Sequence, residues 1–494
     1  MNSITSADSS FQARDERGHV LPPAGHPASG RWALIAFPVV TVVLLMSPAI
    51  KLLVIFFPVM AVLLAAYLYR RNLPGYVTLV CWLWFLTPMV RRVLDYRVPG
   101  WTQPTPVQLA PPLAVCVPLL WLIADWRKVM QRRAAPLLCI VAVCIYATVL
   151  GLLNFAPRLV FQDLLTWVAP LVFAFTLCWH SDQIIELFQA FEKSFLYGLL
   201  VIGAYGVVQF FFLPGWDAFW MRWVNMDSIG NPEPKEVRVF STMNGPQILA
   251  SFLAVGLIIA FTSRHRIRFV AIPLGLLCLV LSLARSGWVA AAAGTLYLLW
   301  HLPHRQRFRL VVVGIVAAVV MIGALQNPDL QEVMSQRFET LTDVKNDTSF
   351  MDRVDSYRAL FAGFMDNPFG LGMGATPAAA EATNQRFVHG GWTGDLGDST
   401  VAMIMTTMGL AGGLVLVGSL LPLGRHLFVG ASVEPAYTRT MRAVFVAMVA
   451  EAALDGIISG PTGFLTWGSI AFCIALGVAD NETQPAIETI SVAA

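Results

Sequence analysis

Charge is what this sequence has least of. Only 13% of its 494 residues are charged, whereas 57% are hydrophobic, and the mean hydropathy is +0.66. Soluble globular chains carry roughly 25% charged residues, so this composition excludes a water-soluble protein of this length. The apolar residues form long continuous blocks, which indicate a polytopic α-helical membrane protein, and their lack of alternation excludes a transmembrane β-barrel.

Metal-binding and disulfide patterns are also absent. The seven cysteines form no Cys-x-x-Cys pair and no cluster with histidine, so we interpret them as small buried apolar side chains. No Asp-x-Asp pair falls on the face where the candidate site lies, and we expect neither a metal nor another cofactor. A formal net charge of only +3 gives no indication of nucleic-acid binding.

The apolar blocks predict the membrane spans. A spanning helix needs about 20 apolar residues, and about fourteen blocks approach that length. They cover residues 32–48, 50–69, 75–90, 106–124, 135–153, 161–179, 194–213, 246–262, 269–284, 286–301, 309–325, 400–422, 440–457 and 461–478. We therefore expect an all-α polytopic membrane protein with about 12–14 transmembrane helices and a large periplasmic loop containing short helices.

Lys and Arg gather in alternate short loops, which the positive-inside rule assigns to the cytoplasm. The loops in question contain Arg70, Arg71, Arg127, Lys128, Arg132, Arg133, Lys193, Arg264, Arg266, Arg268, Arg305, Arg307, Arg309, Arg425, Arg439 and Arg442. The main exception is Arg91, Arg92 and Arg97, which this arrangement puts outside. The N-terminus is then cytoplasmic, and both long loops face outward, to the periplasm in a bacterium.

Five regions follow from this arrangement. They are a disordered cytoplasmic tail at 1–31, transmembrane helices at 32–325 with a periplasmic loop at about 214–245, a large periplasmic loop at 326–399, C-terminal transmembrane helices at 400–478, and a cytoplasmic tail at 479–494. The large loop is too long for a simple connector. The pattern of residues predicts an amphipathic helix from Asp352 to Met365 and a tight turn from Asn367 to Gly374 that ends it. A second surface helix is predicted from Pro328 to Asp343.

Ionisable residues close to lipid are costly, so each one requires an explanation. Arg285 lies between two apolar stretches at an expected outer turn, and Arg238 with Asn244 lies just before another span. Arg353 and Tyr357 share a face of the predicted loop helix. Alternatively, Arg285 is an interfacial arginine that reaches lipid headgroups. Arg238 is then an ordinary loop arginine, and Arg353 and Tyr357 lie on a solvated helix face.

Acidic and titratable residues form a second group of candidates. Glu451 and Asp455 lie one helical turn apart on a late span, where the alternative is a structural helix–helix hydrogen bond. Asp398 begins another span, and His389 is either titratable or an ordinary loop histidine. Arginines at the outer edge would stabilise a lipid-linked diphosphate, and a carboxylate within reach could take a proton from a sugar hydroxyl. This is the apparatus for glycosyl transfer with a diphosphate leaving group, in which arginines supply the electrostatic stabilisation that a metal ion gives elsewhere.

The motifs within about 235–420 resemble those of the O-antigen ligase and polysaccharide polymerase superfamily of bacterial inner-membrane proteins. The segment from Arg238 to Pro246 is similar to the family's Arg…Pro-Asn start of a span, and Ser282 to Gly287 is similar to its Ser-x-Ser-Arg-Gly turn. Arg353-x-x-x-Tyr357 followed by Asn367 to Gly372 resembles the family's Arg-x-x-x-Trp…Pro-x-x-Gly-x-Gly signature. Ligases carry His-Asn shortly before a span ending in Gly-x-x-Gly, where this chain has Asp398-Ser399, which favours a polymerase.

The resemblance implies a mechanism. Arg238 and Arg285, with Arg353 as a third candidate, bind the diphosphate of an undecaprenyl-linked glycan donor, and Tyr357, Asn244 and Glu451 complete the substrate-binding set. Asp398 is the implied base, with His389 or Asp455 as alternatives. No metal is needed.

The acceptor is a glycan or lipid A–core, and a chain-length regulator and a flippase are expected partners. The rival functions are an O-antigen ligase and a transporter or flippase for lipid-linked oligosaccharides. A transporter places its charged residues at the midplane, where only Glu451 is expected here.

Overall fold

A computed structural model describes residues 30–98, 105–129, 135–224, 229–324, 368–375, 399–428 and 436–492. Throughout these ranges the chain is helical, and the one β-type contact found there is an isolated bridge between Gly230 and Val237. The helices are α1 (Arg31–Met46), η1 (Pro48–Leu52), α2 (Leu53–Arg71), α3 (Leu73–Arg97), η2 (Pro106–Leu109), α4 (Ala110–Cys116), α5 (Leu119–Ala124), α6 (Trp126–Val129), α7 (Ala135–Asn154), α8 (Pro157–Trp179), η4 (Ser181–Gln183), α9 (Ile184–Phe212), α10 (Gly215–Val224), α11 (Pro246–Thr262), α12 (Arg268–Leu281), α13 (Arg285–His301), α14 (His304–Ala324), α18 (Thr400–Phe428), α19 (Ala436–Glu451) and α20 (Gly460–Val492).

Each apolar block in the sequence coincides with a helix, so the all-α polytopic membrane fold is confirmed. Within the described chain, seven helical stretches are long and apolar enough to cross a membrane, and four apolar helices of 10–17 residues are shorter. The expected number of about 12–14 transmembrane helices is higher, because that prediction counted shorter blocks as well. The α12–α13 turn shows why two of the helices are short: Ser282, Leu283 and Ala284 are buried, so this turn lies inside the protein.

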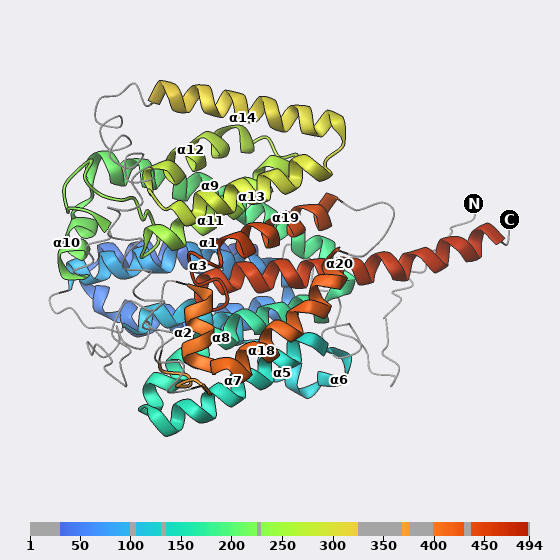
Figure 1. Ribbon diagram of the computed structural model, residues 1–494. Helices are drawn as coiled ribbons and strands as arrows, with labels where there is room; N and C mark the ends of the chain where they lie inside the picture. Colours follow the sequence, from blue (N-terminus) through green and yellow to red (C-terminus); the bar gives the residue numbers. More distant parts are fainter. Residues whose placement is uncertain are drawn as a thin grey trace, which may run out of the picture.

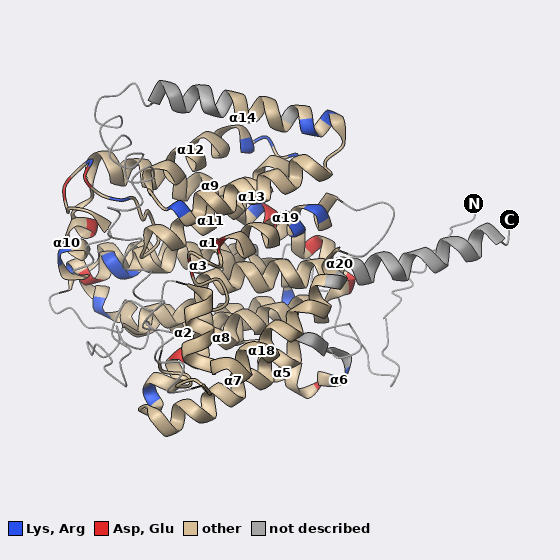
Figure 2. Cartoon of the chain, viewed as in Figure 1, with Lys and Arg blue, Asp and Glu red and all other residues tan. Residues whose placement is uncertain are grey.

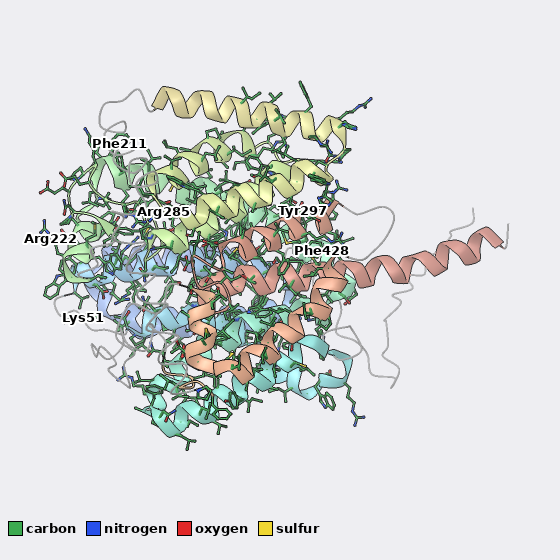
Figure 3. The ribbon with its side chains drawn as sticks, in the orientation of Figure 1. Lys51, Phe211, Arg222, Arg285, Tyr297 and Phe428 are labelled. Atoms are coloured by element: carbon green, nitrogen blue, oxygen red, sulfur yellow. The ribbon has the colours of Figure 1, made fainter. Side chains whose placement is uncertain are left out.

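The helices run side by side, with α10 at one end of the bundle and the far end of α20 projecting at the other (Figure 1). We call the first end the α10 end. Charged residues gather toward the two ends, and the middle of the bundle has few of them (Figure 2). Arg285 lies toward the same side as Arg222 and Lys51, whereas Tyr297 of the same helix lies toward the opposite end beside Phe428 (Figure 3). Helix α13 therefore runs from the Arg285 side of the bundle toward the opposite end.

Aromatic packing holds the centre of the bundle together. Phe85 of α3, Phe195 of α9 and Phe252 of α11 are buried against one another, with ring centroids 5.2, 5.7 and 6.1 Å apart. Gly198 of α9 lies directly against Phe85, since a Cβ there would be 2.4 Å from the Phe85 ring. These contacts fix α3 against α9 and α11, the helices that lead to the candidate site.

The exception to the charge rule has a structural explanation, because all three arginines at the end of α3 have partners. Arg91 pairs with Asp95 at 3.2 Å, and Arg97 donates to the carbonyl oxygen of Leu45 at the end of α1. Arg92 pairs with Asp217 of α10 at 3.1 Å. The positive-inside rule concerns charges left in short loops, whereas Arg91 and Arg92 are buried and paired with carboxylates, and Arg97 alone of the three is exposed.

Several sequence predictions fall outside the described residues. They are the tail at 1–29, the surface helix at 328–343 and the amphipathic helix at 352–365. At the other terminus α20 continues to Val492, so the predicted cytoplasmic tail at 479–494 is largely an extension of the last helix.

Candidate functional site

Arg238 joins the segment before α11 to the turn between α12 and α13. Its guanidinium donates from Nη2 to the carbonyl oxygen of Leu283 at 3.2 Å, and Nε lies 3.4 Å from that of Ser282. The next backbone amide, Val239 N–H, donates to the carbonyl oxygen of Leu281 at 3.1 Å. Arg238 is thus attached to the turn that leads directly into Arg285, and both arginines are half-buried.

The two segments that meet here each contain a strained residue. Ser241 has φ 49° and Leu283 has φ 52°, in the left-handed region that residues with a side chain rarely occupy. Such a conformation persists only where the surroundings enforce it, and it clusters at functional sites. Both carbonyl groups are held by arginines, that of Leu283 by Arg238 and that of Ser241 by Arg92.

Helices α11, α13 and α19 meet closely beside this turn. A Cβ at Gly287 would lie 2.3 Å from Cβ of Ala250, so α13 and α11 are in backbone contact at this level. Ser251 of α11 donates to Oε1 of Glu451, the last residue of α19, at 2.8 Å. Glu451 is fully buried. Helix α19 also packs directly against α13, the helix that begins at Arg285, so the carboxylate lies beside α11 and α13.

Some buried polar atoms at this place have no hydrogen-bond partner within the described chain. These atoms are Thr242 Oγ1, Asn244 Oδ1, Ser286 Oγ and Glu451 Oε2. Ser286 directly follows Arg285 at the start of α13, and Glu451 is the last residue of α19. Such groups are available to a bound molecule, and atoms of the same kind also occur elsewhere in the described chain, for example at Trp84 and Thr438.

The start of α18 and the turn after α19 adjoin each other at the same end. Thr400 Oγ1 donates to the carbonyl oxygen of Asp455 at 2.8 Å and accepts from Ile457 N–H at 3.0 Å. The Asp455 side chain accepts from Gly456 N–H at 2.8 Å. Helices α11, α13 and α18 thus all begin at this end, and the positive end of a helix dipole favours an anion.

The segment from Pro368 to Gly374 returns into the helical bundle. Leu371 N–H and Gly372 N–H donate to the carbonyl oxygens of Thr406 and Thr407 of α18, at 2.8 and 3.0 Å, and Met373 N–H donates to that of Ala147 of α7 at 2.8 Å. Irregular backbone is tolerated within a membrane protein where its polar groups are paired in this way. The tight turn expected at Asn367 to Gly374 is present in its described residues, Pro368 to Gly374. It is anchored between α7 and α18.

A break in α18 provides the backbone groups that bind this segment. Gly409 has φ 63° and ψ −163°, which interrupts the helix and leaves the carbonyl groups of Thr406 and Thr407 available. Leu410 N–H, released by the same break, donates to the carbonyl oxygen of Pro368 at 2.8 Å. The Gly409-x-x-Gly412 stretch and the turn from Pro368 to Gly374 are therefore two halves of one contact.

The described part of the chain brings five of the predicted site residues to the α10 end of the bundle. They are Arg238, Asn244, Arg285, Glu451 and Asp455. The other four predicted residues, His389, Arg353, Tyr357 and Asp398, lie outside the described residues, although Ser399, which follows Asp398 in the chain, is buried at the start of α18.

Sequence reasoning overlooked Asp163. This residue is buried in α8 and accepts from Gly374 N–H at 2.8 Å, so it holds the end of the returning segment. A carboxylate inside the apolar block at 161–179 was the available signal, because charged residues within a span are rarely without a role.

Comparison with known families agrees with this geometry. Residues 269–417 match the family model described as O-antigen ligase. This match supports the resemblance to the O-antigen ligase and polysaccharide polymerase superfamily. Members of the superfamily are glycosyltransferase-type membrane enzymes for lipid-linked glycans.

The matched O-antigen ligase region contains the Arg285 turn, the segment from Pro368 to Gly374 and the break at Gly409, whereas Arg238, Glu451 and Asp455 lie outside it. No curated protein matches this chain. The site therefore combines the matched region with helices on either side of it.

Proposed function

We propose that this protein is a membrane glycosyltransferase that polymerises undecaprenyl-diphosphate-linked oligosaccharide repeat units into exopolysaccharide, capsule or O-antigen. The reaction takes place at the periplasmic face of the bacterial inner membrane, which is the α10 end of the bundle. The observation that carries the proposal is the attachment of Arg238 to the turn that leads into Arg285, with Glu451 bound to the adjoining helix. Two cations and several helix N-termini then face the place where a diphosphate must lie.

The geometry supports a direct displacement. The diphosphate of the donor lies against Arg238 and Arg285, and its polyprenyl tail stays among the apolar helices. An acceptor hydroxyl oxygen attacks the anomeric carbon, the bond from that carbon to the diphosphate oxygen breaks, and its electron pair leaves with undecaprenyl diphosphate. The hydroxyl proton passes to a carboxylate, for which Asp398 is the first candidate and Asp455 or His389 the alternatives. Inversion at the anomeric carbon is the expected outcome.

Arginines can stabilise the leaving diphosphate in this reaction without a divalent ion. A guanidinium offers a rigid fork of donors that matches phosphate oxygens, and it stays charged at all working pH values. Preorganised donors of this kind supply large catalytic stabilisation in a site that excludes water. We therefore expect transfer that persists in EDTA.

An O-antigen ligase is the second candidate, and the family description favours it. The two functions differ in the acceptor, since a polymerase lengthens a lipid-linked glycan and a ligase transfers the finished glycan to lipid A–core. The Asp398-Ser399 pair, at the position where ligases carry His-Asn, is the reason to prefer the polymerase. A chain-length regulator and a flippase would be the natural partners of either enzyme.

The test is a transfer assay with the purified full-length protein and a lipid-linked repeat unit in EDTA. We expect a ladder of lengthened products. Arg285→Ala should lower the rate by at least about 100-fold, because one lost donor to a developing oxyanion has an effect of this size. Arg222→Ala is the matched control, since Arg222 is an exposed arginine at the same end and should be neutral.

Three outcomes would contradict the polymerase proposal. Products formed only when lipid A–core is added would identify a ligase instead. Movement of the lipid-linked unit across a vesicle membrane without any ladder would identify a transporter. A normal ladder from Arg285→Ala would remove the diphosphate-binding role.

A further inference from the structure

Arg92 is a fully buried arginine that reaches from α3 to the segment before α11. Its two terminal nitrogens donate to the carbonyl oxygens of Ser241 and Met243, and Nε lies 3.1 Å from Oδ1 of Asp217. The guanidinium carbon also lies 4.7 Å from the centre of the Phe240 ring. One side chain thus contacts three of the four residues from 240 to 243, which lie between Arg238 and Asn244.

Helix α9 makes a second set of contacts with the same segment. Gln209 of α9 accepts from Phe240 N–H at 3.0 Å and from Ser241 N–H at 2.7 Å, and its amide donates to Oδ2 of Asp217 at 2.7 Å. Tyr205 also donates to Oδ2 of Asp217, at 2.8 Å. Arg92, Asp217 and Gln209 are all fully buried, and we call these three residues the α3–α9–α10 network.

This network holds a backbone that would not otherwise keep its shape. Ser241 has a left-handed conformation, and both its N–H and its carbonyl group are bound by the network. A left-handed residue with a side chain requires a surrounding structure that enforces it. The network supplies that enforcement three residues after Arg238 and three before Asn244.

A rigid fork is required for this task. Arg92 bonds two carbonyl groups through separate nitrogens while Nε faces Asp217, and a lysine ammonium has a single nitrogen that cannot occupy all three positions. Lysine does retain the positive charge opposite Asp217. Replacing Arg92 by Lys therefore separates the shaping of the segment from the pairing of a buried charge.

We propose that Arg92 is a positioning residue for the donor site: through Ser241 and Met243 it fixes the segment that presents Arg238 and Asn244 to the diphosphate. The inference rests on the proposed function. Arg92 does not touch the donor itself, and it acts through the backbone of the segment. Its removal should weaken donor binding more than it slows the chemical step.

The experiment compares Arg92→Lys with Arg91→Lys in the full-length protein in lipid nanodiscs. Arg91 is the preceding residue and is buried as well, but its carboxylate partner is Asp95, one turn further along its own helix. We expect Arg92→Lys to raise the donor KM by about tenfold or more with a smaller change in kcat, since small displacements at a site have effects of this size. Arg91→Lys should leave both constants unchanged.

A second variant and a second measurement guard against a simple folding defect. Gln209→Met keeps the volume of the side chain, leaves the Arg92–Asp217 pair in place and removes both bonds to the Phe240 and Ser241 amides. It should raise the donor KM in the same direction. In both variants, amide hydrogen exchange at 240–243 should become faster while exchange in the central helices stays slow.

The outcomes distinguish the positioning role from the proposed function. A donor KM that is unchanged in both Arg92→Lys and Gln209→Met would overturn the positioning role. The same change in Arg91→Lys as in Arg92→Lys would also overturn it. Undecaprenyl diphosphate, used as a binding probe, should lose affinity for Arg238→Ala; if that variant binds the probe normally, the proposed function fails independently of Arg92.

Discussion

At the scale of single residues, position in the bundle decides what an arginine does. Arg92 is fully buried and has its guanidinium occupied by a carboxylate and two backbone carbonyl groups, which suits it to hold a backbone in place. Arg238 and Arg285 are half-buried beside polar atoms that lack partners within the described chain, which suits them to receive a ligand. Arg238 also donates to two backbone carbonyl groups, so burial and the buried carboxylate partner of Arg92 separate these roles, although the residue type is the same.

Substitution of single residues can identify the group that accepts the proton. Asp398→Asn should lower kcat by about 100-fold or more while the donor KM changes little, because a carboxamide cannot take the proton and general-base catalysis contributes an effect of this size. The measurement is the steady-state rate with the lipid-linked repeat unit. If Asp398→Asn keeps its kcat and Asp455→Asn or His389→Gln loses it, the base role belongs to that other residue.

At the scale of elements, the break in α18 connects two distant parts of the chain. Ordinary helical hydrogen bonds at Thr406 and Thr407 are replaced by bonds to Leu371 and Gly372, so the carbonyl groups at the break keep partners inside the protein. Asp163 of α8 and Ala147 of α7 complete the anchoring. The returning segment thereby ties the large loop to the helix whose first residues adjoin Asp455.

Gly409→Ala should weaken this contact. A Cβ there would lie 2.3 Å from the carbonyl carbon of Phe369 and 2.4 Å from the carbonyl oxygen of Pro368, and φ is 63°. With ψ −163°, this backbone conformation is essentially restricted to glycine, and it costs a residue with a side chain about 1–3 kcal/mol. We expect a lower thermal unfolding midpoint and reduced transfer activity.

Gly418→Ala provides the control for that variant. Gly418 is on the same helix, and within the described chain a Cβ added there would meet no atom within 4 Å. Alanine is preferred to glycine in a helix by up to about 1 kcal/mol, so this variant should be neutral or slightly more stable. Equal stability and activity in the two variants would contradict the proposed contact.

At the scale of the whole molecule, the bundle has two chemically different ends. The α10 end holds the ion-paired Arg91 and Arg92 and the candidate site, whereas basic residues such as Arg266, between α11 and α12, and Arg305, at the start of α14, follow the far ends of α11 and α13. The positive-inside rule assigns the second end to the cytoplasm. The ion pairs of Arg91 and Arg92 reduce the main conflict with that assignment, and Arg97 remains an exposed cation at the α10 end.

Cysteine accessibility tests the orientation. In a background in which the exposed Cys139 is replaced by serine, Glu233→Cys should react with a membrane-impermeant thiol reagent from the periplasmic side, and Arg266→Cys only after the inner membrane is permeabilised. Both positions are exposed, at opposite ends of α11. The reverse pattern of labelling would place the candidate site in the cytoplasm.

The sequence by itself determined the helical membrane fold, the places of the apolar helices and the motifs around Arg238, Arg285 and Gly370. These features are local, since hydropathy and turn residues act over a few helical turns. It could not determine that Arg92 reaches Ser241 or that Asp163 reaches Gly374, because these partners are far apart in the chain and only packing brings them together. The tertiary structure also decided which charges are paired within the protein, such as Arg92 with Asp217, because pairing depends on distance in space.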